Sequence, residues 1–316
     1  MFKKTLPFFI KVITPLHAGS GQDLGIVDLP IQRERHTSFP KIEASGLKGS
    51  IREVFDGLKD DKEKMKELKE KYPDIELTKL EQAISLLFGP ENTDNAHAGA
   101  LGFTDARILL FPVKSAKGVF AWITCPKVLE RFRQDMALAK ENADYKIPDK
   151  LEDGECLVSE NSILVVNNAV ILEEYAFQVS DQKIAKDLAS ELVKRTKIDP
   201  RQLLVLSDND FTDFVNLSTE VITRTRIDNE TGTVESGALF TEEYLPSETV
   251  LYSIALASPI FSRDKGIFRR DGRSEEELVL EFWNDNMPDV MQIGGNATIG
   301  KGLVEIIKGG SNEDSK

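Results

Sequence analysis

The sequence is poor in the residues on which several common kinds of site depend. In 316 residues it has three histidines and only two cysteines, Cys125 and Cys156, which are too far apart for a CxxC motif. A disulfide framework and a zinc ribbon are therefore excluded, and a reduced, cytoplasmic protein is expected. No apolar run approaches the roughly 20 residues of a membrane span, and the first residues lack the apolar segment of a secretory signal. We expect no membrane among its partners.

Basic residues are outnumbered overall but are concentrated in two places. The chain has 40 lysines and arginines against 53 aspartates and glutamates, a net charge of −13. Residues 1–52 nevertheless contain eight basic and four acidic residues, which gives +4. Five basic and two acidic residues over 263–273 give +3. Charges are screened over about 8 Å at physiological salt, so such patches can hold a polyanion on an acidic protein. Ordinary solvated surface is the alternative.

The length suggests one large domain or two modest ones, and the mix of strands and helices predicts an α+β fold. Helices are predicted over 45–55 (capped by Ser45), 77–88, from Pro126, over 181–195, near 209–217 and from Ser274 to Trp283, and 57–71 is expected to be an exposed charged helix or arm. Strands are predicted over 6–14, 102–113, 119–124, 163–166, 169–172 (these two paired through an Asn167-Asn168 turn), 250–257 and 302–307. Strands and helices mix without βαβ regularity, which favours α+β over α/β.

A protruding hairpin is predicted over about 220–245. Its strands contain few large apolar residues, carry Arg224 and Arg226, and flank a turn at 229–232. Glu242 and Tyr244 alternate along the second strand, so their side chains share one face. They are candidates for a site there, and packing at the base of the hairpin is the alternative.

The stretch Gly294 to Gly302 contains GxxxxGK, ending at Lys301, but is not a phosphate-binding P-loop. Gly302 stands where the Mg²⁺-binding hydroxyl belongs, and a strand follows in place of a helix. Either the loop follows a nucleic-acid backbone, or it is a tight structural turn.

A long polar stretch, 17–40, separates the first strand from the first helix. Loops of this length are usually functional or disordered, and His17 and Asp28 both lie in it. Arg33 and Arg35 alternate on an extended segment and can contact successive phosphates. Lys48 and Arg52 continue the basic run on the next helix. The alternative is that Glu34 bridges two surface arginines.

Several segments carry a resemblance to a known family. They are His17-Ala-Gly-Ser-Gly21, Gly25 to Asp28, Arg33-Glu-Arg-His36, Ser45-Gly-Leu-Lys48-Gly-Ser-Ile-Arg52, Thr104 to Val113, Arg226 to Gly232, Gly237 to Pro246 and Ile293 to Gly302. Together they resemble the RAMP superfamily of CRISPR proteins, and within it the family of the fourth Cmr subunit, the backbone subunit of type III-B effector complexes. The glycine-rich loop alone indicates only the superfamily, whereas Asp28 and the Arg33 to His36 segment narrow the resemblance.

The resemblance implies a single RAMP domain over 1–316, with a modified ferredoxin-like (RRM-type) palm, inserted fingers and a thumb. The fingers fall at about 45–100 and 126–200, the thumb is the hairpin at about 220–245, and the glycine-rich loop is 294–302. Copies of the chain are expected to stack along a CRISPR RNA with other Cmr-complex subunits. The thumb then presses between the guide and the target RNA at regular spacing.

The resemblance also implies an activity, the endonucleolytic cutting of target RNA with a divalent metal, Mg or Mn. Asp28 is the expected catalytic residue, as metal ligand or as base, and His17, Glu242 and Tyr244 are expected near the scissile phosphate. The expected RNA-binding residues are Arg33, Arg35, Lys48, Arg52, Arg224, Arg226, Gly294, Gly295 and Lys301. A structural RNA-binding backbone that never cuts is the alternative, and a metal-independent CRISPR-RNA processing enzyme is a third interpretation.

Overall fold

The computed structural model describes residues 2–22, 25–73, 75–91, 97–148, 151–228, 230–269 and 272–309. In these ranges, twelve strands form one mixed sheet with the order β13-β14-β1-β12-β4-β5-β9-β6-β8-β7, and β2 and β3 pair at its side with β4 and β12. The strands are β1 (Lys4–Val12), β2 (Lys41–Ile42), β3 (Leu101–Phe103), β4 (Ala106–Lys114), β5 (Phe120–Thr124), β6 (Glu155–Val158), β7 (Ala169–Leu172), β8 (Tyr175–Val179), β9 (Leu203–Leu206), β12 (Val250–Ala257), β13 (Val290–Gln292) and β14 (Leu303–Lys308).

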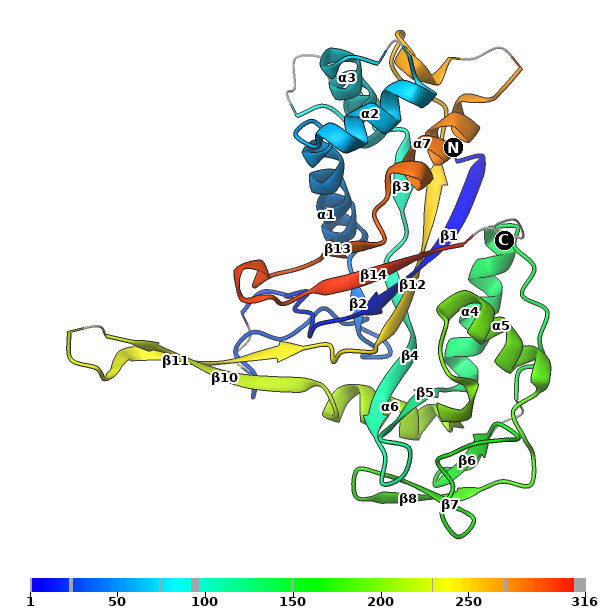
Figure 1. The fold of residues 1–316 in the computed structure, drawn as a ribbon. Helices are drawn as coiled ribbons and strands as arrows, with labels where there is room; N and C mark the ends of the chain where they lie inside the picture. Colours follow the sequence, from blue (N-terminus) through cyan, green and yellow to red (C-terminus); the bar gives the residue numbers. More distant parts are fainter. Residues whose placement is uncertain are drawn as a thin grey trace.

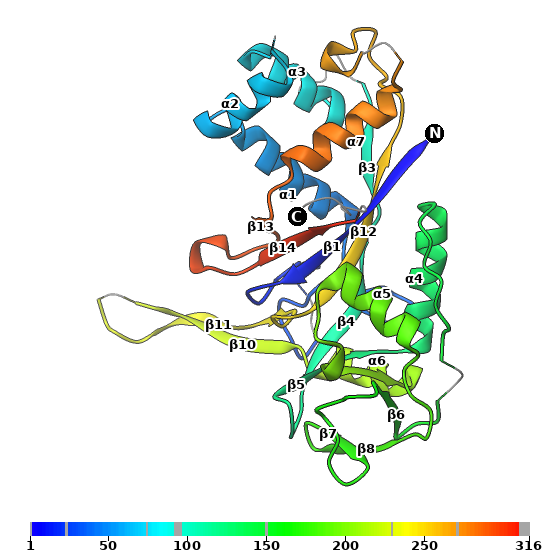
Figure 2. The ribbon, with the colours of Figure 1, turned by 45° about the vertical axis from the view of Figure 1, so that its right-hand side comes forward.

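Two groups of helices flank this sheet (Figures 1 and 2). The group at one end is α1 (Ala44–Gly57), α2 (Lys62–Lys71), α3 (Leu77–Phe88) and α7 (Glu275–Asn286). The other group is α4 (Pro126–Leu138), α5 (Lys186–Thr196) and α6 (Asp208–Leu217). Short 3₁₀ turns occur at η2 (Pro200–Gln202), η3 (Gly266–Phe268) and η4 (Ala297–Ile299).

Strand β1, which lies between β14 and β12, is buried on both faces, which explains why helices lie on both sides of it. Phe8 packs its ring 5.2 Å from Trp283 of α7, and its neighbour Phe9 packs 6.0 Å from Phe132 of α4. Adjacent side chains of a strand point to opposite faces, so β1 joins the two halves of the core. The α+β prediction is confirmed.

Some local predictions were wrong. Ser45 does not cap α1, which begins after Glu43 with no side-chain cap; the N–H of Ala44 instead donates to Asp105 from a distant loop, at 2.9 Å. The predicted pairing of 163–166 with 169–172 is also wrong, because β7 pairs with β8 and only the bridge Val166–Ala169 remains.

The hairpin consists of β10 (Glu220–Ile227) and β11 (Val234–Tyr244), which pair antiparallel and form a separate two-stranded sheet. It projects away from the rest of the molecule (Figure 1). Asn229, in the predicted turn, lies outside the described residues, whereas Gly232 has a positive φ of 67° and donates its N–H to Asp228. Because the hairpin lies outside the main sheet, its orientation depends on the contacts at its base.

Cys125 and Cys156 are buried free thiols. In the described part of the chain, every helix is too short or too polar to cross a membrane.

Candidate nucleic-acid interface and catalytic site

The candidate site lies where the base of the hairpin meets the long polar loop that follows β1. This loop adds itself to the free edge of β11. Leu29 donates its N–H to Thr241 O and accepts from the N–H of Glu243, both at 3.0 Å, and Leu16 exchanges two backbone hydrogen bonds with Leu245. These backbone hydrogen bonds hold the loop residues in place as they would hold a strand in a sheet.

Asp28 is exposed and is held by one residue of the hairpin. The Thr241 N–H and hydroxyl both donate to Asp28 Oδ2, at 2.7 and 2.9 Å, and the Asp28 N–H donates back to Thr241 Oγ1 at 3.0 Å. The bond from the Thr241 N–H is the chief reason that the pKa of Asp28 is lowered. Asp28 Oδ1 has no hydrogen-bond partner among the described residues. The site therefore presents an ionised carboxylate with one oxygen available.

Glu242 and Tyr244 lie on the opposite face of β11 and are buried, with 4% and 0% of their surfaces exposed. Glu242 Oε2 accepts from the Tyr244 hydroxyl at 2.6 Å and lies 3.3 Å from Arg224 Nε. Glu242 Oε1 accepts from Asn296 Nδ2 at 2.6 Å. Both carboxylate oxygens are thus occupied by protein groups.

This environment fixes the protonation of the pair. Burial opposes ionisation of Glu242, but the bonds from Tyr244 and Asn296, together with the positive charge of Arg224 nearby, lower the pKa of Glu242. Burial, followed by the bond to Glu242, raises the pKa of Tyr244 to about 12. Glu242 is therefore an anion and Tyr244 a neutral donor at physiological pH.

His17 joins this buried cluster. Its Nδ1 donates to the carbonyl of Glu243 at 2.7 Å, and its Nε2 lies 3.5 Å from Glu242 Oε1. The N–H of Gly295 donates to the His17 carbonyl at 2.9 Å, and a Cβ on Gly294 would lie 2.3 Å from that carbonyl oxygen. Gly294 is therefore required by a close backbone approach, as expected for a tight structural turn; a contact of the loop with RNA stays a prediction.

Arg33 and Arg35 have different surroundings. The Arg33 guanidinium donates to Ser38 O, Val215 O and Asn216 Oδ1 and pairs with Glu243 Oε1 at 2.5 Å, whereas Arg35 is exposed. The alternative in which Glu34 bridges these two arginines is wrong, because Glu34 pairs with Arg131 at 2.7 Å. Arg33 is engaged within the protein, and Arg35 is the more available cation.

Lys48 and Arg52 are also engaged within the protein. Lys48 donates to Leu101 O at 2.9 Å, and burial lowers its pKa. Arg52 donates to Gly89 O at 3.0 Å and lies 3.4 Å from Asp56. An RNA contact by either residue stays a prediction, but both have a role in holding α1 in place.

A groove of about 900 Å³ lies along the hairpin and contains both of its predicted RNA-binding arginines. Its lining combines cationic and apolar side chains, namely Arg224, Thr225, Arg226, Ile227, Glu235, Ala238, Phe240 and Ile299. Ile299 belongs to η4 of the glycine-rich loop, whose Lys301 lies 5.0 Å over the Tyr244 ring. Cations beside apolar surface are suited to a sugar-phosphate backbone and its bases.

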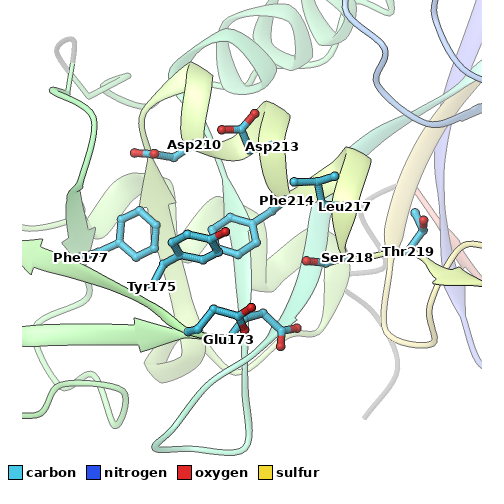
Figure 3. Close-up of a pocket in the computed structure, with 10 residues that line it drawn as sticks. Glu173, Tyr175, Phe177, Asp210, Asp213, Phe214, Leu217, Ser218 and Thr219 are labelled. Carbon is cyan, nitrogen blue, oxygen red and sulfur yellow. The ribbon is translucent and has the colours of Figure 1, made fainter.

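A second pocket, of about 540 Å³, lies between β8 and α6 (Figure 3). It has an aromatic floor and acidic side chains and is lined by Glu173, Glu174, Tyr175, Phe177, Asp210, Asp213, Phe214, Leu217, Ser218 and Thr219. Four carboxylates without a lining cation repel phosphate. This pocket is therefore not the nucleic-acid site.

The metal prediction rests on Asp28 alone. Over the described residues, no three His, Cys, Asp or Glu side chains gather in a way that could hold a metal ion. Mg²⁺ is often held by one or two carboxylates together with substrate phosphates and water. Asp28, with one free oxygen, fits a metal of that kind.

Sequence reasoning missed Thr241 and Asn296. Thr241 meets Asp28 across 213 positions, and Asn296 meets Glu242 across 54. Both are common polar residues, and each finds its hydrogen-bond partner only because the fold brings distant segments together. The available sequence signal was that Thr241 precedes Glu242 and Asn296 lies in the glycine-rich loop, both in segments that carry the resemblance.

Four features together define the class of this protein. They are a mixed sheet, a projecting hairpin, a loop bound to the base of the hairpin, and a glycine-rich turn beside that base. The chain belongs to the RAMP superfamily, which matches residues 9–305. The CRISPR system Cmr endoribonuclease Cmr4 of Pyrococcus furiosus is 40% identical to it over 307 residues, covering 93% of this chain and 92% of that protein. The CRISPR system CMR subunit Cmr4 of Saccharolobus solfataricus is 26% identical, covering 95% of each. The crystal structure of oligomeric Cmr4 from P. furiosus superposes with a TM-score of 0.69 at 32% identity, covering 98% of this chain and 99% of that one. The family predicted from the sequence is confirmed.

Proposed function

We propose that this chain is the repeated backbone subunit of a type III-B CRISPR effector complex and cuts target RNA paired with the CRISPR RNA. The 40% identity to a protein named as a Cmr endoribonuclease, over nearly the whole of both chains, supports the activity. The observation that carries the assignment of the site is the carboxylate of Asp28, exposed, ionised and locked to the base of a projecting hairpin.

Cleavage is expected to use the target's own 2′-hydroxyl. Its oxygen attacks the adjacent phosphorus, the bond to the 5′-oxygen breaks, and a cyclic phosphate and a 5′-hydroxyl result. Alignment of attacking and leaving oxygens supplies much of the rate, up to about 7–11 kcal/mol in well-oriented intramolecular reactions. The thumb hairpin splays the backbone where it displaces a base pair, which restricts this geometry to one position per subunit.

Asp28 acts at the attacking oxygen. Its free Oδ1 is placed to accept the 2′-hydroxyl proton or to hold Mg or Mn, which would stabilise charge on the phosphate oxygens. Thr241 keeps the other oxygen occupied, so the carboxylate has one defined orientation.

The RNA path follows the hairpin groove and its cations. Arg224, Arg226 and Lys301 border this path, and the exposed Arg35, in the same polar loop as Asp28, is a further candidate phosphate contact. Phosphate contacts of this kind fix register and carry no sequence code. A head-to-tail contact between copies generates an open filament, which suits a guide RNA longer than one subunit. The palm, finger and thumb roles, the other Cmr subunits and the cytoplasmic location belong to this proposal.

The test uses the assembled complex, a matched target RNA and mapped cut positions, with and without Mg²⁺. Asp28→Ala is expected to keep assembly and RNA binding and to lose cleavage by roughly 10²- to 10⁴-fold. Asp264→Ala is the matched control, because Asp264 is likewise exposed and held by a backbone N–H, but its other carboxylate oxygen accepts from Gln82 of α3 and not from the hairpin.

Each other outcome points to one alternative. Normal cutting by Asp28→Ala means that the catalytic assignment is wrong. Binding without cutting by the wild-type complex favours the structural backbone. Cutting of the CRISPR RNA itself, unchanged by chelator, favours a processing enzyme.

A further inference from the structure

We propose that Asn296 is a positioning residue that latches the base of the hairpin to the glycine-rich loop, and that Glu242 and Tyr244 belong to this latch and do not touch the RNA. The inference rests on the proposed function, since it assigns residues of the same site. It replaces the expectation that Glu242 and Tyr244 lie at the scissile phosphate.

The first support is the alternation of β11. Thr241 holds Asp28 on one face of the strand, whereas Glu242 points to the other face, toward Asn296. Adjacent residues of a strand cannot present their side chains to the same phosphate. Asp28 is exposed, but Glu242 and Tyr244 are 4% and 0% exposed, so RNA reaches the first and not the others.

The second support is the hydrogen bonding of Asn296. Its Nδ2 donates to Glu242 Oε1 at 2.6 Å and to the Tyr244 hydroxyl at 3.2 Å, and its Oδ1 accepts from Arg224 at 3.2 Å. One side chain therefore binds both strands of the hairpin. A left-handed backbone, with φ of 67°, aims it from the start of η4. Asparagine tolerates this conformation better than most residues.

The third support is that the latch controls Asp28 indirectly. The hairpin is a separate two-stranded sheet, so contacts at its base set its tilt. Asp28 is bonded to Thr241, one residue before Glu242, and a tilt of β11 therefore moves the carboxylate. Catalytic geometry tolerates little displacement, so a loosened latch slows cutting without removing any group that reacts.

The test exchanges donor and acceptor across the latch. Glu242→Gln replaces one of the two acceptor oxygens with an amide donor, which then faces either the Asn296 amide or the Tyr244 hydroxyl and Arg224. Asn296→Asp places a carboxylate against the Glu242 carboxylate. Each single variant should lower the single-turnover cutting rate roughly tenfold while target affinity stays within about twofold. The double variant, Glu242→Gln with Asn296→Asp, restores a donor facing an acceptor at unchanged net charge. It should return to within about threefold of the wild-type rate.

A double variant as slow as Glu242→Gln alone would mean that the Glu242 carboxylate itself takes part in the reaction, which overturns the latch. Wild-type rates in both single variants would overturn it as well. Asn161→Asp makes the same chemical change on an exposed loop and is the matched control.

A second measurement does not depend on cleavage. Hydrogen exchange of the β10 and β11 amides in the free protein should speed up in each single variant and slow again in the double variant. If wild-type complex fails to cut but exchange follows this pattern, the proposed function fails and the latch stands. Unchanged exchange in Asn296→Asp, in a complex that cuts, means that the latch fails alone.

Discussion

Asp28 and Thr241 lie 213 positions apart and share three hydrogen bonds, two from Thr241 to one carboxylate oxygen and one from the Asp28 N–H to the threonine hydroxyl. The resemblance implies that Asp28 is the catalytic group and that the hairpin is the thumb. The hairpin therefore orients the proposed catalytic carboxylate. Any movement of the hairpin base is transmitted to Asp28.

The titration of Asp28 should not change the cutting rate near neutral pH. The Thr241 bonds lower the pKa of Asp28 below its ordinary 3.8, so the carboxylate stays ionised at every pH above that value. The function of an ionised Asp28, as base or as metal ligand, is lost only as pH falls through this lowered pKa. Single-turnover rates between about pH 5 and 8 at fixed metal concentration test this. A titration of the rate inside that interval would assign proton transfer to another group.

The hydroxyl of Thr241 should affect the cutting rate more than the shape of its side chain does. Thr241→Val removes the Oγ1 bonds in both directions while keeping the backbone bond and the shape, so cutting should slow roughly three- to tenfold. Thr241→Ser keeps the hydroxyl and should cut at nearly the wild-type rate. The rates are compared in assembled complex with saturating target. Equal rates in both variants would show that the backbone N–H alone orients Asp28.

The fold was predictable from the sequence where neighbouring residues alone determine the local structure. Ser274 accepts from the N–H of Glu277 and caps α7 as its sequence indicates, and Pro126 begins α4. Asn167 and Asn168 have the positive φ expected of a turn. The strand that pairs with β7 was not predictable, because the choice between 163–166 and β8 depends on burial against distant helices.

The sequence predicted which candidate residues lie near one another, but not how they are arranged. His17, Glu242 and Tyr244 do lie together, and alternation correctly put Glu242 and Tyr244 on one face of the hairpin. Sequence spacing cannot tell which face of β11 meets Asp28, since the loop docks through backbone bonds that any residue can make. Nor could it show that Arg33 is occupied by the buried Glu243.

Substitution of Arg33 should therefore lower the stability of the protein, whereas substitution of Arg35 should weaken RNA binding. Arg33→Ala leaves the buried Glu243 carboxylate without its cation and should cost about 3 kcal/mol of the free energy of unfolding. Arg35→Ala should stay within about 0.5 kcal/mol of wild type. Urea unfolding of the free protein measures both. Arg35→Glu should weaken guide RNA binding equally for unrelated sequences, and a base preference in the remaining binding would contradict a phosphate contact.

The end of the hairpin should be dispensable for folding and required for the spacing of cuts. In the described residues, the loop after β1 pairs with β11 at Leu29 and Leu16, near the base of the hairpin. Arg226, near the end, is 77% exposed and has one partner there, Glu235, at 3.4 Å. Removal of residues 229–236 takes away little buried apolar surface, so the unfolding midpoint should remain close to that of the full chain. Target RNA bound to the shortened complex should lose the regular interval between cuts, as mapped on a sequencing gel, because no arm reaches between guide and target. Regular cuts from the shortened complex would remove the thumb role from this hairpin, and failure to fold would place the segment in the core.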